Sequence, residues 1–503
     1  MKLRLILILP IIILWSEVFS QKEDYHWVLG YSLFRPVSDT NYGRAELLFD
    51  NNKMLNVKKT YQCINKLNFT NASICDTTGK LLFYTNGLEI FNNEHNVISN
   101  GDSLNPGEFA ISNECCGYTL ESGALILKYP GSSNKYLIIH HTIDRIPFVW
   151  YSLNMLTTLV ELNSNTGNLN VVYKNKSIYS DTLLRGSLSA CRHANGRDWW
   201  IPCFFYSGNK CFMFLLDPTG LNLHHVQDIP FEFSRSGGGQ AQYSPDGSKY
   251  AFIHRNSESY MEFFLADFDR CEGKFSEMNY ETLDGFLQCG VAFSPNSELL
   301  YLALEKELYQ LVLYESNPYK NKIKIDSIDG FESFPGFPSY FFLMQLAPDG
   351  KIYICNGRSP TYLSIIEFPD RRGKSCSVMQ HSISIVANSS MPNFPYFRLG
   401  AAKGTVCDSI ITSVSNYDDD NLNEEIEIIP NPNTGNFIVQ LPKEWVKDVL
   451  NLEMYSSSGI LLGNWKARSE SLDLDLDLNP GLYYLKALVP NGEVTVKKLI
   501  INK

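Results

Sequence analysis

The chain has 503 residues, of which 44% are hydrophobic and 13% aromatic, and its formal net charge is −11. So many apolar and aromatic residues exclude a disordered chain. The acidic balance argues against a nucleic-acid partner, because phosphate binding needs clustered Lys and Arg. The length predicts about three domains at roughly 150 residues each, although large β folds exceed that size as single units.

The first twenty residues predict a secretory signal peptide. Lys2 and Arg4 come first, an apolar run follows (5–15), and Ser20 is the small residue before a cut at Gln21. The alternative is a single membrane anchor, but the run is shorter than the roughly 20 residues that span a bilayer. No other stretch of the sequence approaches that length, so we expect no transmembrane segment.

Twelve cysteines predict disulfides once the chain is exported, because their number is even and the compartment is oxidising. Metal binding is the alternative, but no Cys-x-x-Cys pair occurs. The adjacent pair Cys115–Cys116 cannot easily bridge to itself without strain. Turn signals between Cys191, Cys203 and Cys211 predict that these three lie on neighbouring strands. The candidate disulfide cysteines are Cys63, Cys75, Cys191, Cys203, Cys211, Cys355 and Cys376, with their pairing left open.

Short β-strands separated by turns are predicted throughout residues 21–407. Runs such as 81–91, 198–206 and 351–357 are rich in Phe, Tyr, Ile and Leu, which fit a pleated, half-buried surface. Turn phrases introduce most of these runs, and their centres lie 50 to 62 residues apart. The phrases are DTTGK (76–80), GSSNK (131–135), ANGRD (194–198), SPDGSK (244–249), SPNSE (294–298) and APDGK (347–351).

A period of this length, built from several strands, predicts the blades of a β-propeller. Because one blade cannot bury both of its faces, blades must stack in a ring. The six turn phrases, with strands from the two ends of the region at 45–50 and 396–400, predict seven blades, and six is the alternative. A long array of β-sandwiches is the competing architecture.

Four phrases of this region carry a resemblance to a known family. They are GKLLFYTNGLEIFNNEHNVISNGDSL (79–104), HANGRDWWI (193–201), QYSPDGSKYAF (242–252) and MPNFPYFRLG (391–400). With them, residues 27–402 resemble exported bacterial proteins that carry a WD40-like propeller. The resemblance implies a secreted propeller and no particular activity.

Motifs of this region that suggest active sites are interpreted as structural. GDSL at 101–104 spells the nucleophile block of a serine esterase family, but Asn-Gly before it and Asn-Pro-Gly after it are turn sequences. The pairs His140–His141 and His224–His225 are predicted to point to opposite faces of their strands, so neither pair would grip one metal ion. The glycine-rich SRSGGGQ (234–240) is expected to connect two blades, with a binding loop at the ring mouth as the alternative.

The pair Trp199–Trp200 is expected to place one ring in the core and one outside, where it would be free to stack on a sugar. No nucleophile elbow, phosphate-binding loop or metalloprotease helix occurs in the sequence. We therefore predict no catalytic residue, no metal ligand and no cofactor, and we expect a non-catalytic binding or adhesion module. The alternative is a secreted hydrolase whose active site lies in the propeller mouth, with residues scattered over the blade loops.

The composition changes after Cys407. Residues 408–426 form an acidic polar linker, and 427–503 contain no cysteine. In 472–478 Leu alternates with Asp, which is typical of a strand with one face in water. With turn signals between its strands, this module predicts a small antiparallel β-sandwich.

Several short blocks follow one another in this last module. They are Pro430, Asn431 and Pro432 with Gly435, the turn at Gly459, Gly481 with Tyr483, and a Lys-Leu-Ile-Ile ending. In that order they resemble the type A C-terminal sorting domain of the type IX secretion system, found in Bacteroidota. The resemblance implies export by Sec and then by the type IX translocon, to the cell surface or the medium. It also implies a sortase-like protease that cuts in the linker.

The expected domains are therefore a signal peptide (1–20), an all-β propeller (21–407), a linker (408–426) and a sorting domain (427–503). The propeller's extracellular ligand is left open as a glycan or a protein.

Overall fold

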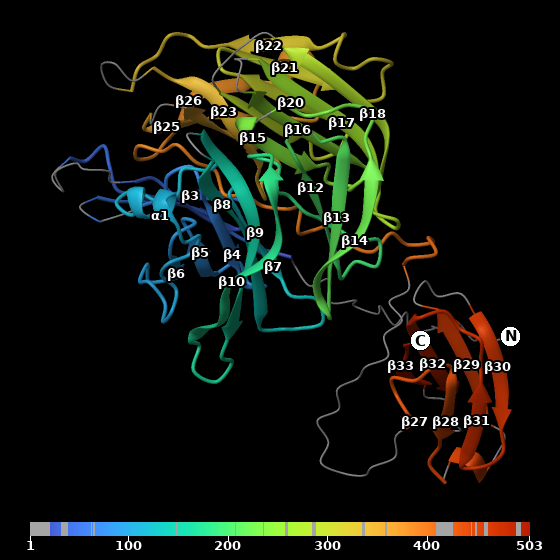
Figure 1. The fold of residues 1–503 in the computed structure, drawn as a ribbon. Helices are drawn as coiled ribbons and strands as arrows, with labels where there is room; N and C mark the ends of the chain where they lie inside the picture. Colours follow the sequence, from blue (N-terminus) through green and yellow to red (C-terminus); the bar gives the residue numbers. More distant parts are fainter. Residues whose placement is uncertain are drawn as a thin grey trace, which may run out of the picture. The chain divides into compact units, whose positions relative to one another are not determined.

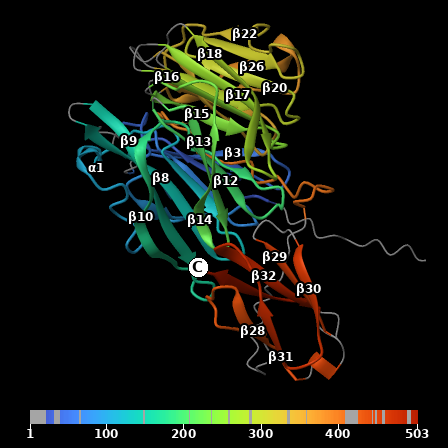
Figure 2. The ribbon, with the colours of Figure 1, turned by 45° about the vertical axis from the view of Figure 1, so that its right-hand side comes forward.

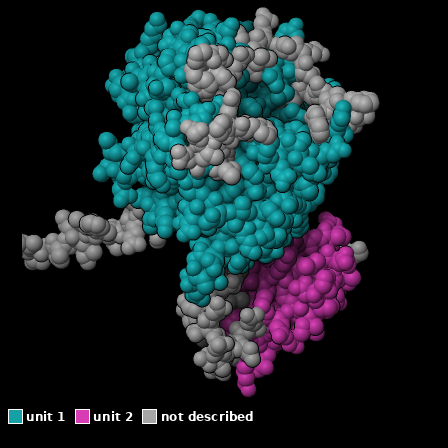
Figure 3. Space-filling view, turned by 90° about the vertical axis from the view of Figure 1, so that its left-hand side faces the viewer, with its two compact units in different colours: residues 1–408 teal, residues 409–503 magenta. Residues whose placement is uncertain are grey.

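The computed structural model describes residues 21–502 apart from 32–38, 62, 64–65, 147–148, 207, 235, 257–259, 284–287, 334–337, 358–359, 409–425, 444, 448–449, 457–460 and 489–493. The expected signal peptide with Ser20, almost all of the expected linker, and Gly459 thus lie outside the described residues. The chain divides into two compact units, Met1–Asp408 and Ser409–Lys503 (Figure 3).

Seven antiparallel sheets make up the described part of the first unit, and each is built from consecutive strands. We call them blades 1 to 7. Blade 1 holds β1 (His26–Leu29), β2 (Arg44–Phe49) and β3 (Leu55–Thr60); blade 2 holds β4 (Ala72–Cys75), β5 (Leu81–Thr85) and β6 (Ile90–Asn92); blade 3 holds β7 (Ala124–Lys128), β8 (Lys135–Ile146), β9 (Val149–Leu162) and β10 (Leu169–Leu183); blade 4 holds β11 (Cys191–Arg192), β12 (Trp199–Phe204), β13 (Lys210–Asp217) and β14 (Gly220–Asp228).

The remaining blades of this unit have four strands each. Blade 5 holds β15 (Ser236–Tyr243), β16 (Lys249–Asn256), β17 (Met261–Asp269) and β18 (Lys274–Leu283); blade 6 holds β19 (Cys289–Phe293), β20 (Leu299–Leu304), β21 (Glu307–Val312) and β22 (Ile323–Ser327); blade 7 holds β23 (Tyr340–Leu346), β24 (Ile352–Gly357), β25 (Tyr362–Ile366) and β26 (Val378–Ser384). Two short helices, α1 (Glu108–Ser112) and the 3-10 helix η1 (Gly373–Cys376), lie in connections.

Burial explains why the middle strands of a blade are apolar on both faces. All six residues of β12, of β20 and of β24 are buried, because a neighbouring blade covers each face. The outer strands β14 and β18 alternate buried or half-buried with exposed residues over much of their length, as expected where one face meets water. Each large apolar side chain that is fully buried contributes about 1.5–3 kcal/mol to folding.

The six turn phrases occupy equivalent places in the ring. Each connects the first strand of a blade to the second, in blades 2 to 7 in turn. In blade 2, for example, the Asp76 carboxylate accepts hydrogen bonds from the backbone N–H groups of Thr78 and Lys80, at 2.8 and 3.0 Å. The phrases therefore mark one end of six blades, and blade 1 is the one without a phrase.

Blade 1 is completed by the chain segment that follows blade 7, residues 385–390. Ala387 accepts a hydrogen bond from the Tyr31 N–H (3.2 Å) and donates one to the Asn41 carbonyl (2.7 Å). The Asn388 side chain accepts one from the Gly30 N–H at 3.1 Å. In Figure 1 the orange strands of blade 7 lie beside the blue strands of blade 1, and Lys59 donates to the Ser384 hydroxyl at 2.7 Å. The two ends of the propeller thus close its ring.

The predicted fold class is confirmed: the first unit is an all-β, seven-bladed propeller, so seven is the correct alternative. The expected strand at 45–50 exists as β2, but 396–400 forms no strand. The reason is that the segment that completes blade 1 is the earlier one near Ala387. Residues 396–400 come after these contacts and are not part of the blade.

The second unit is a β-sandwich of two antiparallel sheets (Figure 2). One sheet holds β27 (Glu427–Ile429), β28 (Asn436–Gln440) and β31 (Ser471–Asp475); the other holds β29 (Leu450–Ser456), β30 (Leu461–Ala467), β32 (Gly481–Leu488) and β33 (Val494–Ile501), and η2 (Trp445–Lys447) is a 3-10 helix. Phe437 and Val439 of β28 and Leu452 of β29 meet in its core. The alternation of Leu with Asp holds over β31, where Asp473 and Asp475 are exposed.

The disulfides do not lie where we expected them. Cys271 bridges to Cys407, and the adjacent Cys115 and Cys116 bridge to each other. All seven candidate cysteines are free thiols: Cys63, Cys75, Cys191, Cys203, Cys211, Cys355 and Cys376.

Strand register explains why the closely spaced cysteines of blade 4 stay unpaired. Cys191, Cys203 and Cys211 do lie on three neighbouring strands. However, Cys203 faces Phe212 and Cys211 faces Phe204, so consecutive pairing positions turn their side chains to opposite faces of the blade. Cys203 belongs to the core shared with blade 3, and Cys191 and Cys211 belong to the core shared with blade 5. Those two are separated along the strands, because Cys191 lies opposite Trp200 and Cys211 lies opposite Phe204 of β12. Burial keeps all three inert as small apolar side chains.

Candidate functional site

Two side-chain amides, those of Asn393 and Gln240, link neighbouring blades by hydrogen bonds near the propeller axis. The Asn393 amide donates to the carbonyls of Ala124 and Leu188, each at 3.0 Å, and its backbone N–H donates to Asn71 at 2.9 Å. These partners belong to the inner ends of blades 2, 3 and 4. Asn393 lies in the MPNFPYFRLG phrase (391–400), but the sequence had not indicated this role for its side chain.

Gln240 does the same on the other side of the axis. Its amide oxygen accepts hydrogen bonds from the N–H groups of Val291 (3.1 Å) and Met344 (3.0 Å), and its amide nitrogen donates to the Met344 carbonyl (2.6 Å). One side chain of blade 5 thus satisfies the first strands of blades 6 and 7. A polar residue inside a buried strand is the only sequence signal for such a role.

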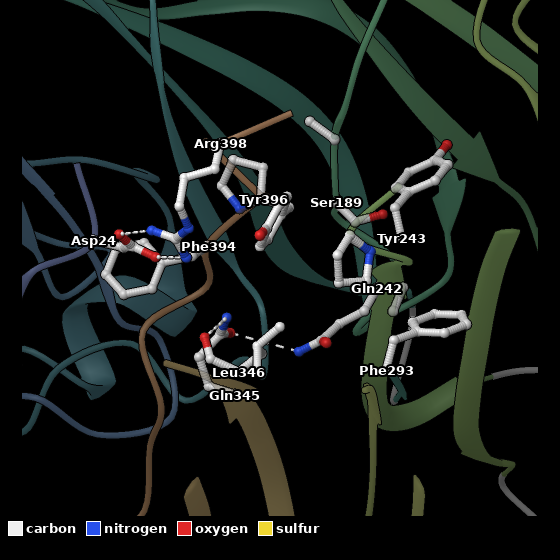
Figure 4. A pocket seen from close by; sticks show the side chains of 14 residues that line it. Asp24, Ser189, Gln242, Tyr243, Phe293, Gln345, Leu346, Phe394, Tyr396 and Arg398 are labelled. Atoms are coloured by element: carbon white, nitrogen blue, oxygen red, sulfur yellow. Dashed lines mark hydrogen bonds and ion pairs between the residues drawn. The ribbon is translucent and has the colours of Figure 1, made fainter. Parts of the chain in front are cut away.

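A small cavity lies where the closing segment crosses the axis (Figure 4). Arg398 forms a bidentate ion pair with Asp24, at 2.6 and 2.7 Å, and Gln242 reaches Gln345 at 3.5 Å. The volume accessible to water there is about 30 Å³. Such a volume suits one or two ordered waters, so the chain's own residues occupy this end of the axis.

The opposite end of the inner strands carries a half-buried carboxylate, Glu121. Burial raises the pKa of this carboxyl above its usual range, and the nearby charges of Arg185 and Arg255 oppose that rise. The glycine-rich segment 236–239 packs against it: a Cβ on Gly238 would lie 2.6 Å from a Glu121 carboxylate oxygen. These glycines therefore allow the close approach of two blades. They lie in β15, the first strand of blade 5, so the expectation that 234–240 forms a connection between blades is wrong for 236–240.

The two histidine pairs differ from one another. His140 is buried and bonded through Nδ1 to Asn105 (2.7 Å) and through Nε2 to Thr158 (3.0 Å), which is the behaviour of a core histidine. His224 and His225 contradict the prediction of opposite faces. A β-bulge against β13 brings both rings to one side, with their Nδ1 atoms 2.9 Å apart. Among the described residues, no group of three or more His, Cys, Asp or Glu side chains is placed to hold a metal ion.

The GDSL sequence forms a turn that is hydrogen-bonded to β10, the outer strand of blade 3. Lys174 donates to the Asp102 carboxylate at 3.1 Å, and the Asn175 amide donates to the Ser103 carbonyl at 2.8 Å. Asn105, just after the motif, has a φ of +51°. Ser103 is thus a turn residue beside a sheet edge, as its flanking sequence predicted.

Both tryptophans of the Trp199–Trp200 pair are buried, at 0% and 1% exposure, so the expectation of one exposed ring is wrong. Trp199 faces the core shared with blade 3, and Trp200 faces the core shared with blade 5. The prediction had assumed a strand with one face in solvent, whereas a middle strand of a propeller blade is covered on both faces.

A groove of about 660 Å³ lies between blades 2 and 3. One wall consists of the turn and hairpin of blade 2, and the other consists of the hairpin that joins β9 to β10. Its polar lining includes Asp76, Lys80, Asn92, Asn93, Glu94, Ser99, Thr166, Asn168 and Asn170. Part of the lining lies in the 79–104 phrase, but that phrase implied only a propeller and no binding site, so the sequence did not indicate this groove.

In the second unit, the residues of the Pro-Asn-Pro block hold the last strand. The Asn431 side chain donates to the Lys498 carbonyl (2.6 Å) and accepts from the Ile500 N–H (2.9 Å), both in β33. Gly435 has a φ of +111°, and a Cβ there would clash with the Leu476 carbonyl oxygen. The Tyr483 hydroxyl donates to the Asn479 carbonyl at 2.8 Å.

The remaining residues singled out from the sequence have simpler places. Pro430 and Pro432 flank Asn431 in the same block, and Gly481 begins β32. Gln21 is the first residue that the structure describes and is half-buried.

Residues 427–502 match the family model described as the secretion system C-terminal sorting domain. The second unit is a secretion system C-terminal sorting domain. Its match begins with β27 and extends beyond β33, so the sorting domain includes both sheets of the sandwich. The sorting domain marks this protein for type IX secretion to the cell surface or the extracellular space. No described helix has the length and apolar character needed to cross a membrane.

Comparison of whole chains adds the following likenesses to the sorting-domain match. No curated protein matches the chain. A protein of Lactobacillus plantarum is similar in structure at 10% identity and a TM-score of 0.43, over 73% of this chain and 99% of the other. The periplasmic gluconolactonase of Pseudomonas aeruginosa is similar at 11% identity and a TM-score of 0.39, over 73% and 98%. A putative 6-phosphogluconolactonase of Bacteroides uniformis is similar at 12% identity and a TM-score of 0.32, over 90% and 97%. At these TM-scores the likenesses indicate neither a substrate nor an activity.

Proposed function

We propose that the propeller is a non-catalytic binding module that the sorting domain brings to the outside of the cell. The observation that supports this most directly is that the chain's own side chains occupy one end of the propeller axis. The Asp24–Arg398 ion pair lies at this end, and Asn393 of the same closing segment donates to backbone carbonyls of blades 3 and 4. Polar groups that satisfy one another in this way stabilise the ring and leave its outer surface and grooves for recognition.

The proposed export route has two steps. A signal peptide at 1–20 takes the chain through Sec, and the type IX translocon then recognises the sorting domain. A sortase-like protease would cut between the two units, within the expected linker, and leave the propeller released or attached at the surface of a Bacteroidota-type cell.

A secreted hydrolase is the second candidate, and Glu121 is the observation that favours it. A carboxyl whose pKa is raised by burial is a candidate general acid. The neighbouring Arg185 and Arg255 favour a structural ion pair instead, because positive charges stabilise the carboxylate.

Binding and hydrolysis are distinguished with the secreted full-length protein. We expect it to be retained on immobilised polysaccharides or extracellular proteins without releasing products from them. Product release that disappears in Glu121→Gln, while the folded protein persists, would establish the hydrolase. Failure to bind any of these surfaces, in a protein whose melting transition is intact, would overturn the binding proposal.

A further inference from the structure

The groove between blades 2 and 3 exists because the two blades differ in strand length. Blade 2 ends in β6, which has 3 residues, whereas β9 and β10 of blade 3 have 14 and 15 residues. The β9–β10 hairpin therefore extends past its neighbour and leaves about 660 Å³ between them. This volume falls in the range of about 300–1,000 Å³ that is usual for small-molecule sites.

The walls of the groove are held in place without a ligand, since a side chain caps each turn. Asp76 accepts from the Lys80 N–H at 3.0 Å. Asn92 accepts from the N–H groups of Glu94 (3.0 Å) and Asn96 (2.9 Å). In the opposite hairpin, Asn163 accepts from the Thr166 N–H at 3.1 Å. Such capped turns lose little conformational entropy when a ligand arrives.

Six polar side chains of the lining are not used by the fold. Within the described residues, no hydrogen bond or ion pair involves the side chains of Lys80, Asn93, Glu94, Ser99, Asn168 and Asn170. They come from both walls, and three of them are amides, each able to donate and accept at once. Leu82, Val97 and Leu169 add apolar surface between these polar groups.

We propose that this groove binds a short neutral oligosaccharide, an inference that rests on the proposed binding function. Sugar hydroxyls both donate and accept, as amides do, and the C–H faces of a sugar ring suit the apolar residues between them. The lining has one basic side chain, Lys80, and two acidic side chains, Asp76 and Glu94. Its charge therefore does not favour a polyanion. Strand addition by a peptide is disfavoured further along β10, because Lys174 and Asn175 already hold the 100–105 turn there.

The test compares two double variants of the full-length protein. Asn168→Ala with Asn170→Ala removes two amides from the groove. Asn52→Ala with Asn56→Ala removes two exposed amides from the β2–β3 hairpin of blade 1, where no described partner bonds to their side chains. Each protein is screened on an array of short neutral gluco-, xylo-, manno- and galacto-oligosaccharides, and hits are measured by calorimetry.

We expect at least one oligosaccharide to bind, with tenfold or greater weakening in the groove variant and unchanged affinity in the control. Equal affinity in both variants would overturn the groove as the site and leave the binding function standing. Retention on proteins alone would overturn the sugar class but not the binding function. Failure on every surface would overturn both proposals.

Discussion

At the scale of single residues, burial changes the pKa values of several histidines. His140 and His141 are completely or almost completely buried, and burial lowers their pKa values to about 3 and about 4. His95, near Glu46, is also shifted by burial, to about 4. All three stay neutral in the folded protein under conditions that would charge them in the unfolded chain. They make the propeller sensitive to acid.

Acidification from about pH 6.5 to about pH 4.5 should lower the free energy of unfolding. The unfolded chain takes up these protons near pH 6.5, and the folded chain does so only near pH 4 or below, so the unfolded state binds more protons in this window. His141→Gln should reduce the slope by as much as about 1.4 kcal/mol per pH unit, one proton's worth. Denaturant unfolding of the full-length protein at several pH values measures this. An unchanged slope in the variant would contradict it.

At the scale of elements, the predicted turns and strands were largely right where local chemistry decides. The six turn phrases each connect the first two strands of a blade, and the Leu-Asp alternation forms the half-exposed strand β31. The expected strand at 396–400 and the exposed tryptophan were wrong. Whether a segment closes the ring, and whether a strand face meets solvent, depends on neighbours far away in the sequence.

The last strand of the sorting domain should loosen when Asn431 is changed. Asn431→Ala removes two solvent-exposed hydrogen bonds to β33, and each such hydrogen bond typically contributes about 0.5–1.5 kcal/mol. Hydrogen–deuterium exchange of the full-length protein should be faster over β33. Asn464→Ala, an exposed residue of β30 whose side chain has no described partner, is the matched control. Equal exchange in the two variants would show that Asn431 does not hold the strand.

At the scale of the whole molecule, the ring-closing segment is also the connection to the sorting domain. It starts on blade 1 at Ala387 and crosses the axis at Asn393. It then pairs Arg398 with Asp24 and ends at Cys407, which is bonded to Cys271 of blade 5. A pull on the chain beyond Cys407 is therefore carried by blade 5 before it reaches the closing contacts.

Removing this disulfide should expose the closing segment to protease. Cys271→Ser with Cys407→Ser opens a link between positions 136 residues apart, and such links typically contribute about 2–4 kcal/mol. We expect faster cleavage within 385–407 and a lower melting temperature. Cys115→Ser with Cys116→Ser is the control, because a bridge between adjacent residues closes no long loop. Cleavage at the same rate in both variants would contradict the role of Cys271–Cys407.

The sequence by itself determined the repeat, the all-β class and the sorting domain, because turn chemistry, strand composition and short motifs act locally. The twelve cysteines illustrate what it left open. Their number predicted oxidation, but the register in blade 4 separates Cys203 from Cys211, and the fold brings Cys271 to Cys407 across 136 positions. Ring closure, the Gln240 and Asn393 bonds, and the groove likewise required the tertiary structure, because each joins residues whose distance in space cannot be read from their distance along the chain.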